Sequence, residues 1–405
     1  MKNWAYNLIT IWYLWMAIAQ FESFTTQIVR WSITTLLFII SIHSLRNWKY
    51  EKPPILIIIL LIYTLLTCIW ANDKVYAILR YIAFMQMLVW CTFAVPSMIR
   101  HHIISIENIC NLALILSIID TILIVYWGGN PIPFIFSSGR YSCGNTRLVS
   151  TGVAAVSMYS LPFLLFYINE YKGMGKIKYF LIILAIVNCL LLIASKGRAA
   201  IITTIVFIPL LLYLLGLRKY KLIFFIILLI IFLCCISAMT WHRTLRLDKR
   251  DITSNRLLMA TLLWDDCNSR SPLIGCGNAM DRKFLEAYIS KGTEEEIYSN
   301  PHNQFISVFY NWGWVGVTLF YGIIISILVR YINIFKYIDE IPENKYLILL
   351  GCYFFMQVIK YNNSGGLDSA GSVQSYMYWL YGGILLSWKT TLIKNNEIKR
   401  VIDNK

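Results

Sequence analysis

The chain has 405 residues, of which 58% are hydrophobic and only 14% are charged, and its mean hydropathy is +0.61. Soluble domains carry about a quarter charged residues, so this composition excludes a soluble enzyme, a disordered protein and an extended fibre, and it indicates a multi-pass membrane protein. A net charge of +15 serves orientation and contact with anionic membrane lipids in such a protein. We therefore expect no nucleic-acid partner.

Apolar runs long enough to cross a bilayer recur along the whole chain. A helix needs roughly 20 apolar residues to cross the hydrocarbon core. Twelve runs approach this length, at residues 4–21, 28–45, 54–71, 76–98, 103–127, 149–168, 178–195, 199–217, 222–240, 305–329, 346–361 and 372–388. The sequence therefore predicts an all-α integral membrane protein of about 12 transmembrane helices, with a tight hairpin between the seventh and eighth.

The distribution of basic residues indicates how these helices are oriented. With a cytoplasmic N-terminus, 19 Lys and Arg residues fall on the cytoplasmic side and six in the short outer loops, as the positive-inside rule requires. We therefore expect both termini inside. Residues 1–240 would hold nine helices, 241–304 an extracytoplasmic loop, and 305–405 the last three helices and a cytoplasmic tail. Within the loop, 255–264 and 282–290 are amphipathic and predict short helices over the outer face.

Charged and polar residues near the outer side of the membrane are the best indication of a functional site. Arg80 lies inside the fourth run, Arg198 at the tip of the predicted hairpin, and His302 where the long loop enters the tenth run. Each has a purely structural alternative. An arginine within a helix can extend to the interface, an arginine at a hairpin tip can anchor it there, and a lone loop histidine often has no function.

The motifs around these residues resemble the O-antigen ligase and O-antigen polymerase family of bacterial membrane proteins. A His-Asn pair is followed by nine residues and then by Gly-x-x-Gly; a Ser-Pro-Leu-x-Gly-x-Gly stretch precedes it; and a tip with the sequence Lys-Gly-Arg-Ala follows an earlier apolar helix. The residues concerned are His302, Asn303, Gly313 and Gly316, then 271–277, then 195–200. The resemblance covers about residues 140–360.

Two departures accompany this resemblance. The family more often has Ser-Arg-Gly at the tip, and the Arg-x-x-x-Leu of its ligases reads Arg198 to Ile202 here. Ligases and polymerases share the His-Asn motif, so the sequence leaves the choice between them open.

The resemblance implies glycosyl transfer during surface polysaccharide (lipopolysaccharide) assembly, at the outer leaflet of the bacterial cytoplasmic (inner) membrane. The donor would be a glycan on undecaprenyl diphosphate. The acceptor would be a sugar hydroxyl on lipid A core or on another lipid-linked glycan, and the site would face the periplasm or exterior.

Within this interpretation, the site residues have distinct roles. His302 would act as the catalytic general base, since a neutral imidazole near pH 7 suits that task. Arg198 would contact the diphosphate, because the guanidinium fork matches phosphate oxygens, and a tight turn at Gly197 would direct it toward the site. Asn303 would either bind a sugar hydroxyl or cap the tenth helix. Four more arginines on the outer side are substrate-binding candidates: Arg80, Arg140, Arg147 and Arg256.

The sequence has no Gly-rich phosphate loop, no Asp-x-Asp pair and no Glu-rich metal site. We therefore expect a reaction without metal or cofactor, and we interpret Asp265 and Asp266 as a solvated turn. Cys267 and Cys276 lie on the oxidising side, so they either form a disulfide or stay apart, with Cys276 buried beside its flanking glycines.

A lipid-linked saccharide flippase or other polysaccharide transporter is the alternative function. Many spans and buried arginines suit it equally well. It would need polar residues on both sides of the membrane midplane, whereas the charged residues here gather near one face, which favours an enzyme of the outer leaflet.

Overall fold

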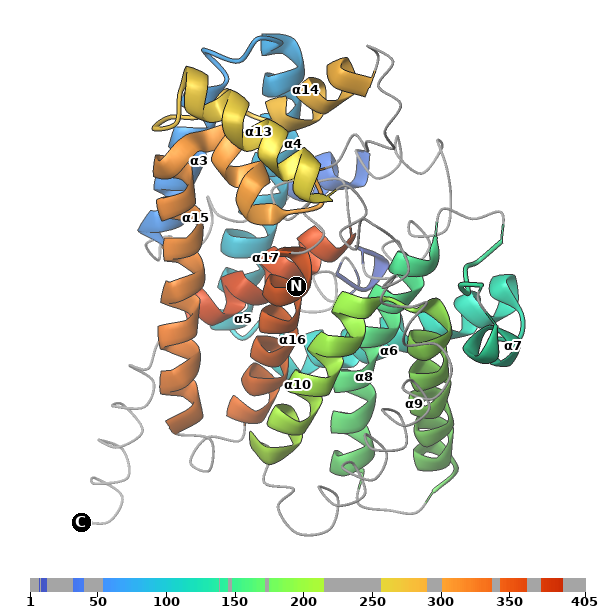
Figure 1. Ribbon diagram of the computed structural model, residues 1–405. Helices are drawn as coiled ribbons and strands as arrows, with labels where there is room; N and C mark the ends of the chain where they lie inside the picture. Colours follow the sequence, from blue (N-terminus) through green and yellow to red (C-terminus); the bar gives the residue numbers. More distant parts are fainter. Residues whose placement is uncertain are drawn as a thin grey trace, which may run out of the picture.

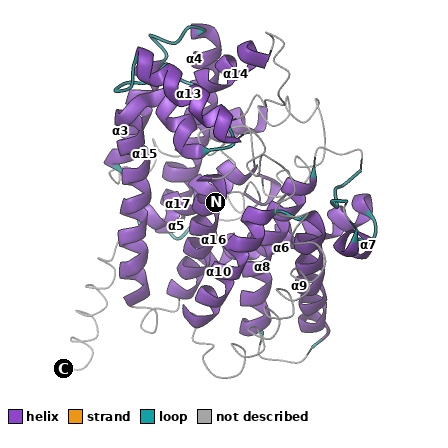
Figure 2. Cartoon of the chain, in the orientation of Figure 1, coloured by secondary structure: helices purple, strands orange, loops and turns teal. Residues whose placement is uncertain are grey.

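The computed structural model describes residues 7, 9–12, 32–39, 54–137, 139–144, 148–171, 175–214, 256–289, 301–336, 343–362 and 373–388. Within them every regular element is helical and no strand occurs (Figure 2), which confirms the all-α fold class. Most of the first two predicted spans, the ninth span at 222–240, the chain after residue 388 and the candidate Arg147 lie outside the described residues.

The helices follow the predicted runs closely (Figure 1). Their bounds are α3 Ile55–Thr67, α4 Lys74–Val89, the π-helical turn η1 Trp90–Ala94, α5 Val95–Arg100, α6 Ile106–Gly128, α7 Ile132–Phe136, α8 Ser150–Glu170, α9 Lys176–Ser195, α10 Arg198–Leu214, α13 Arg256–Arg270, α14 Met280–Ile289, α15 Gln304–Lys336, α16 Asn344–Asn362 and α17 Val373–Ser387.

Five of these segments are long and apolar enough to cross a membrane: Lys74–Arg100, Ile106–Gly128, Ser150–Glu170, Lys176–Ser195 and Gln304–Phe335. They correspond to five of the twelve predicted runs. The helices α3 and α10 are apolar but shorter. The predicted number of about 12 spans therefore stays a prediction, whereas the multi-pass character is confirmed.

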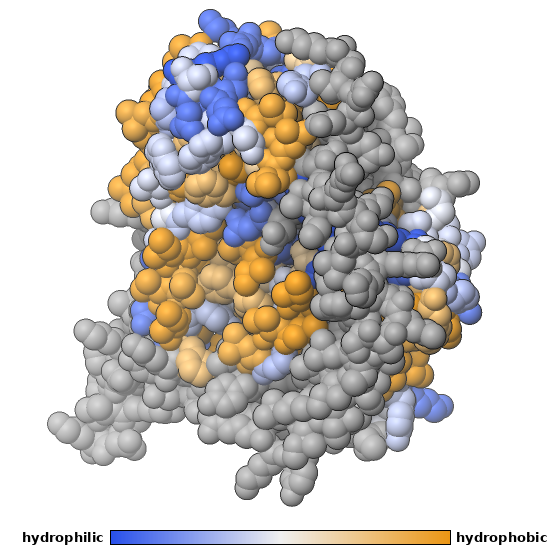
Figure 3. All heavy atoms as spheres, viewed as in Figure 1, coloured by the Kyte–Doolittle hydropathy of each residue, from blue (hydrophilic) through white to orange (hydrophobic). Residues whose placement is uncertain are grey.

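Large hydrophobic side chains are exposed in stripes that fit contact with lipid. On α3, Ile55, Ile59, Ile62 and Leu66 are exposed at three- and four-residue spacing, which places them on one face of the helix. In water such a stripe would be a liability; in a bilayer it is the expected outer surface. Figure 3 shows hydrophobic residues over the lower part of α10 and α15, and hydrophilic residues gathered over α13.

The helices form two groups that α16 joins. In one group α8 packs against α6, α9 and α10; in the other, α15 packs against α3, α13 and α14. The helix α16 contacts α8 and α10 on one side and α15 and α17 on the other. Because α13 and α14 lie at one end of the molecule, over the start of α15 (Figure 1), they cover that end of the bundle.

The two helices predicted within 241–304 are confirmed. The helix α13 buries Met259, Leu263 and Cys267, which recur every four residues and so share one face. The Trp264 ring stacks on Phe309 of α15 at 4.5 Å. Both Asp265 and Asp266 lie inside α13, so their interpretation as a turn was wrong. A helix forms there because its apolar face has the start of α15 to pack against.

Candidate active site

The helix α15 breaks at Gly313, and this break organises the site. Gly313 has φ 63° and ψ −166° within a segment of 33 residues. An unbroken helix of that length would extend about 50 Å, well beyond a hydrocarbon core of about 30 Å. The break therefore separates a first half, Gln304 to Trp312, from the long second half. The first half lies against α13 and α14.

The 271–277 segment fills the break. A helix interruption exposes backbone groups that must find other partners. Here the Cys276 and Gly277 N–H groups donate to the carbonyls of Tyr310 and Asn311, at 2.7 and 3.1 Å. In return, Trp314 and Val315 donate to Pro272 and Leu273, at 3.0 and 3.1 Å. The two glycine motifs, separate in the sequence, are therefore one structural unit.

Glycine is required where the two backbones cross. Gly275 has φ +79°, and a Cβ there would lie 2.5 Å from the nitrogens of Trp312 and Gly313. A Cβ at Gly313 would lie 2.4 Å from the Leu273 carbonyl oxygen, and one at Gly316 would lie 2.1 Å from Trp312 Cβ. Both Gly313 and Gly316 therefore lie in close packing that leaves no room for a side chain.

Side chains from α3, from the loop after α3 and from the segment before α14 hold this crossing in place. Tyr63 donates to the Trp312 carbonyl at 2.7 Å, and Trp70 donates to the Gly275 carbonyl at 3.1 Å. The fully buried Trp312 ring donates to Asn278 Oδ1 at 3.1 Å. The crossing is thus fixed on both sides, and the start of α15 is fixed with it.

His302 and Asn303 lie directly before this fixed helix. Asn303 Oδ1 accepts the Ile306 N–H at 3.1 Å, and the Asn303 carbonyl accepts the Ser307 N–H at 3.0 Å. Asn303 is therefore an N-cap, which was one of its two predicted roles. His302 is half-buried and has φ 52°, a left-handed conformation that is uncommon for a residue other than glycine. Its placement is set by the cap rather than by the helix.

Arg198 begins α10 at the tip of the hairpin with α9, and the hairpin is confirmed. The turn is tight, as expected at Gly197, and its left-handed residue is the neighbouring Lys196, with φ 53°. A Cβ on Gly197 would lie 2.3 Å from Ala154 Cβ on α8, so glycine is needed there for packing. Lys196 is nearly buried and its Nζ donates to the Ser137 carbonyl.

The segment that follows α7 is tied to the same tip. The buried Tyr141 donates its N–H to the Ala194 carbonyl at 3.0 Å, and its hydroxyl donates to the carbonyls of Ile124 and Gly129. Burial raises the pKa of Tyr141 to about 12, so the hydroxyl remains a donor. Arg140, next to it, is exposed. The structure thus brings Arg140 to the same end of the bundle as Arg198.

The other candidates that the structure describes are Arg80 on α4 and Arg256 on α13. Arg80 is partly exposed on α4, donates to Tyr76 at 3.1 Å and stacks over the Tyr76 ring at 5.1 Å. Tyr76 is one turn nearer the helix start, so Arg80 extends in the direction expected of an arginine at a membrane interface. Arg256 is the first residue of α13. His302 and Arg198 begin helices of different groups (Figure 1).

Two features of this region had no signal in the sequence. Lys360 is nearly buried in the last turn of α16, with its Nζ 4.4 Å from the centre of the Tyr361 ring. The other is a cavity beneath α14, of about 390 Å³, to which the 271–277 segment contributes Cys276. Neither the burial of one lysine nor a cavity between distant segments is visible in hydropathy.

A comparison with known families bears on the whole arrangement. Residues 180–321 match the family described as O-antigen ligase, and no curated protein matches the chain significantly. The matched region begins in α9 and ends in the second half of α15, and so contains the hairpin tip, the 271–277 segment, His302 and the break at Gly313. The resemblance seen in the motifs is confirmed over these residues, and the match supports a role in glycosyl transfer for surface polysaccharide assembly in a bacterial membrane.

Proposed function

On the premise that this chain belongs to the O-antigen ligase and polymerase family, we propose that it transfers a glycan from undecaprenyl diphosphate to a saccharide acceptor at the outer leaflet of the inner membrane. One observation carries the proposal: His302 stands at the start of a helix whose first half is fixed by the interlocked 271–277 segment. These backbone contacts hold the helix start, and with it His302, in one position. Acid–base catalysis needs a side chain held at a fixed distance from the proton it receives.

His302 acts as the general base in this mechanism. The acceptor hydroxyl oxygen attacks the anomeric carbon of the donor, the bond from that carbon to the diphosphate oxygen breaks, and the diphosphate leaves with the electron pair. The hydroxyl proton passes to the imidazole. The partial positive charge at the start of α15 disfavours the imidazolium, so it keeps His302 neutral before reaction.

Arginine side chains bind the departing diphosphate. Arg198 is the foremost candidate because it begins a helix at the braced hairpin tip, and the guanidinium fork offers two donors to phosphate oxygens. Arg80, Arg140, Arg147 and Arg256 complete the proposed outer-side set, and the Asn303 amide adds a contact to a sugar hydroxyl. The reaction is metal-independent and needs no cofactor, because the diphosphate linkage supplies the energy.

Deletion of the gene followed by complementation tests this function. Without the protein, surface glycan should be lost and the undecaprenyl-linked glycan should accumulate. An oxidant of sugars that cannot cross the membrane should react with this glycan when it is applied from outside. A flippase defect would leave the same intermediate on the cytoplasmic side. Loss of single-unit and long glycan together indicates a ligase, whereas retention of single units alone indicates a polymerase.

A further inference from the structure

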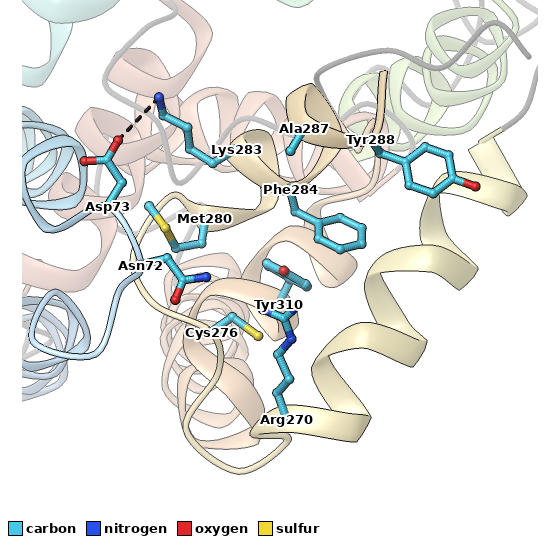
Figure 4. A pocket seen from close by; sticks show the side chains of 10 residues that line it. All are labelled: Asn72, Asp73, Arg270, Cys276, Met280, Lys283, Phe284, Ala287, Tyr288 and Tyr310. Carbon is cyan, nitrogen blue, oxygen red and sulfur yellow. Dashed lines mark ion pairs between the residues drawn. The ribbon is translucent and has the colours of Figure 1, made fainter. Parts of the chain in front are cut away.

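The cavity beneath α14 is separate from the residues proposed above for catalysis. Its walls come from the α3–α4 loop, the end of α13, the 271–277 segment, α14 and the first half of α15 (Figure 4). Of the predicted site residues that the structure describes, none lines it. A volume of about 390 Å³ is within the range of small-molecule sites.

The charges around the cavity cancel. Lys283 Nζ lies 3.4 Å from Asp73 Oδ2 on one wall, and on the other Arg270 lies 3.0 Å from Asp266. Asp73 stays ionised, because the Tyr76 N–H that it accepts lowers the pKa of its carboxyl and Lys283 lowers it further. A site for a diphosphate needs an excess of cationic donors. In this cavity each basic side chain is paired with a carboxylate. The two ion pairs offer hydrogen-bond donors and acceptors without a net charge, which suits an uncharged ligand.

Aromatic rings form the rest of the lining. The Phe284 ring lies 5.5 Å from the Tyr310 ring at 44°, and Tyr288 stands at the edge, 6.5 Å from Phe284. Tyr310 donates to Asp266 at 2.7 Å, so its ring is held in one orientation. An apolar ring surface beside paired polar groups suits a sugar, whose C–H face packs on aromatics while its hydroxyls form hydrogen bonds.

The walls are held rigidly. Asp281, only 2% exposed, accepts the Ser307 hydroxyl at 2.6 Å, and its N–H donates to Asn311 Oδ1 at 3.0 Å. These bonds join the first turn of α14 to the first half of α15. A cavity between two helices joined in this way is formed before any ligand arrives, and preformed sites lose less free energy on binding.

We propose that this cavity is a saccharide-binding subsite, which holds one sugar ring of the glycan away from the reacting hydroxyl. From Gln304 to Tyr310 the helix rises about 9 Å, so a ring at Tyr310 is not the ring at His302. The inference rests on the proposed function and extends it: the substrate is an oligosaccharide recognised by more than its reacting sugar.

Cys276 supplies a native probe of occupancy, because its half-exposed thiol lines the cavity. The hydrogen bond from Cys267 lowers the pKa of Cys276, which favours reaction with N-ethylmaleimide. Purified full-length protein, kept reduced, is alkylated with and without the soluble oligosaccharide released by mild acid from the cell's own lipid-linked intermediates. Mass spectrometry of the Cys276 peptide gives the rate, and Lys176→Cys, at an exposed position at the start of α9, supplies the internal reference.

The oligosaccharide should slow alkylation of Cys276 in a saturable way and leave alkylation of the Lys176→Cys thiol unchanged, and inorganic diphosphate should protect neither thiol. Protection by diphosphate but not by oligosaccharide would overturn the inference in favour of an anion site. No protection by either would overturn it as well.

Phe284→Leu tests the aromatic surface with little change of volume. Ring packing of about 0.5–1.5 kcal/mol corresponds to a roughly 2- to 10-fold higher oligosaccharide concentration for half-protection. Tyr126→Leu, which changes an exposed ring on α6, is the matched control. In this variant the oligosaccharide should protect Cys276 at the same concentration as in the wild type. Equal protection in both variants would count against the aromatic site.

His302→Asn separates this inference from the proposed function. It should stop glycan transfer and leave the protection of Cys276 intact. If the wild type transfers glycan but the oligosaccharide does not protect Cys276, the subsite proposal is wrong and the proposed function stands. If the oligosaccharide protects Cys276 but the wild type transfers no glycan, the proposed function is wrong and the subsite proposal stands.

Discussion

Gly275 and Gly313 meet backbone to backbone, so that a Cβ on either would lie 2.5 Å from a backbone nitrogen of the other. Both have positive φ, +79° and +63°. This contact joins the segment before α14 to the break in α15. It thereby fixes the position of the first half of α15, the helix that follows His302. The geometry at His302 therefore depends on two residues that have no side chain.

Alanine at either glycine should unfold this crossing. Gly275→Ala and Gly313→Ala each combine backbone strain with overlap, for which about 2–5 kcal/mol of lost stability is expected. Gly322→Ala is the matched control in the same helix, since no atom lies within 4 Å of its added Cβ. Thermal unfolding in detergent measures the difference. Equal midpoints for all three variants would contradict the interlocked backbones.

The base role of His302 predicts a large loss of rate without loss of protein. His302→Ala should lower glycan transfer by about 10²–10⁴-fold, which is roughly 3–5 kcal/mol. His302→Asn is the sharper variant, because asparagine tolerates the left-handed backbone at this position but cannot accept the proton as a base.

The N-cap provides the comparison for His302. Loss of the cap in Asn303→Ala costs only about 1 kcal/mol of stability. Asn303→Asp keeps the capping oxygen and removes only the amide proposed to contact a sugar hydroxyl. Glycan length and amount are measured at matched expression. If His302→Asn makes glycan of wild-type length and amount, His302 is not the general base, and catalysis then rests on the arginines.

Arg198 should require its guanidinium and not merely its charge. Arg198→Ala should abolish transfer, and Arg198→Lys should restore little of it, because an ammonium cannot form the bidentate contact with phosphate oxygens. Initial rates with purified lipid-linked donor check this. Full activity in Arg198→Lys would favour the interpretation as a simple interfacial anchor.

The proposed orientation can be tested at two described positions. Ser137, whose carbonyl accepts the Lys196 ammonium, lies in the segment proposed to face outside. Lys176 begins α9, at the end of that helix away from Lys196. An impermeant thiol reagent applied to intact cells should label Ser137→Cys and spare Lys176→Cys. The reverse pattern would place the termini outside and remove an outer-leaflet mechanism.

Cys267 and Cys276 are free thiols in the structure, and their reactivities should differ with pH. The hydrogen bond from Cys267 lowers the pKa of Cys276, whereas that bond and burial raise the pKa of Cys267. Alkylation of Cys276 should therefore rise with pH through a midpoint below that of an ordinary thiol, with Cys267 unreactive over the same range. A cross-linked peptide in unreduced protein would establish the disulfide alternative instead.

Hydropathy and motif order were enough to predict much of this molecule. The all-α membrane fold, the α9–α10 hairpin, the two helices within 241–304 and the family resemblance all follow from composition and local pattern, because burial in lipid imposes apolar helices. Asn303 as an N-cap was one of two predicted roles, and capping is a local interaction.

Only the tertiary structure decided what distant segments do to one another. At the hairpin tip the left-handed backbone falls on Lys196, and Gly197 is needed because Ala154 of another helix occupies the space beside it. The pairing of Asp73 with Lys283, and the cavity between them and Tyr310, likewise depends on how α14 packs against α4 and α15. Such contacts are set by packing between helices, and no periodicity within one helix specifies them.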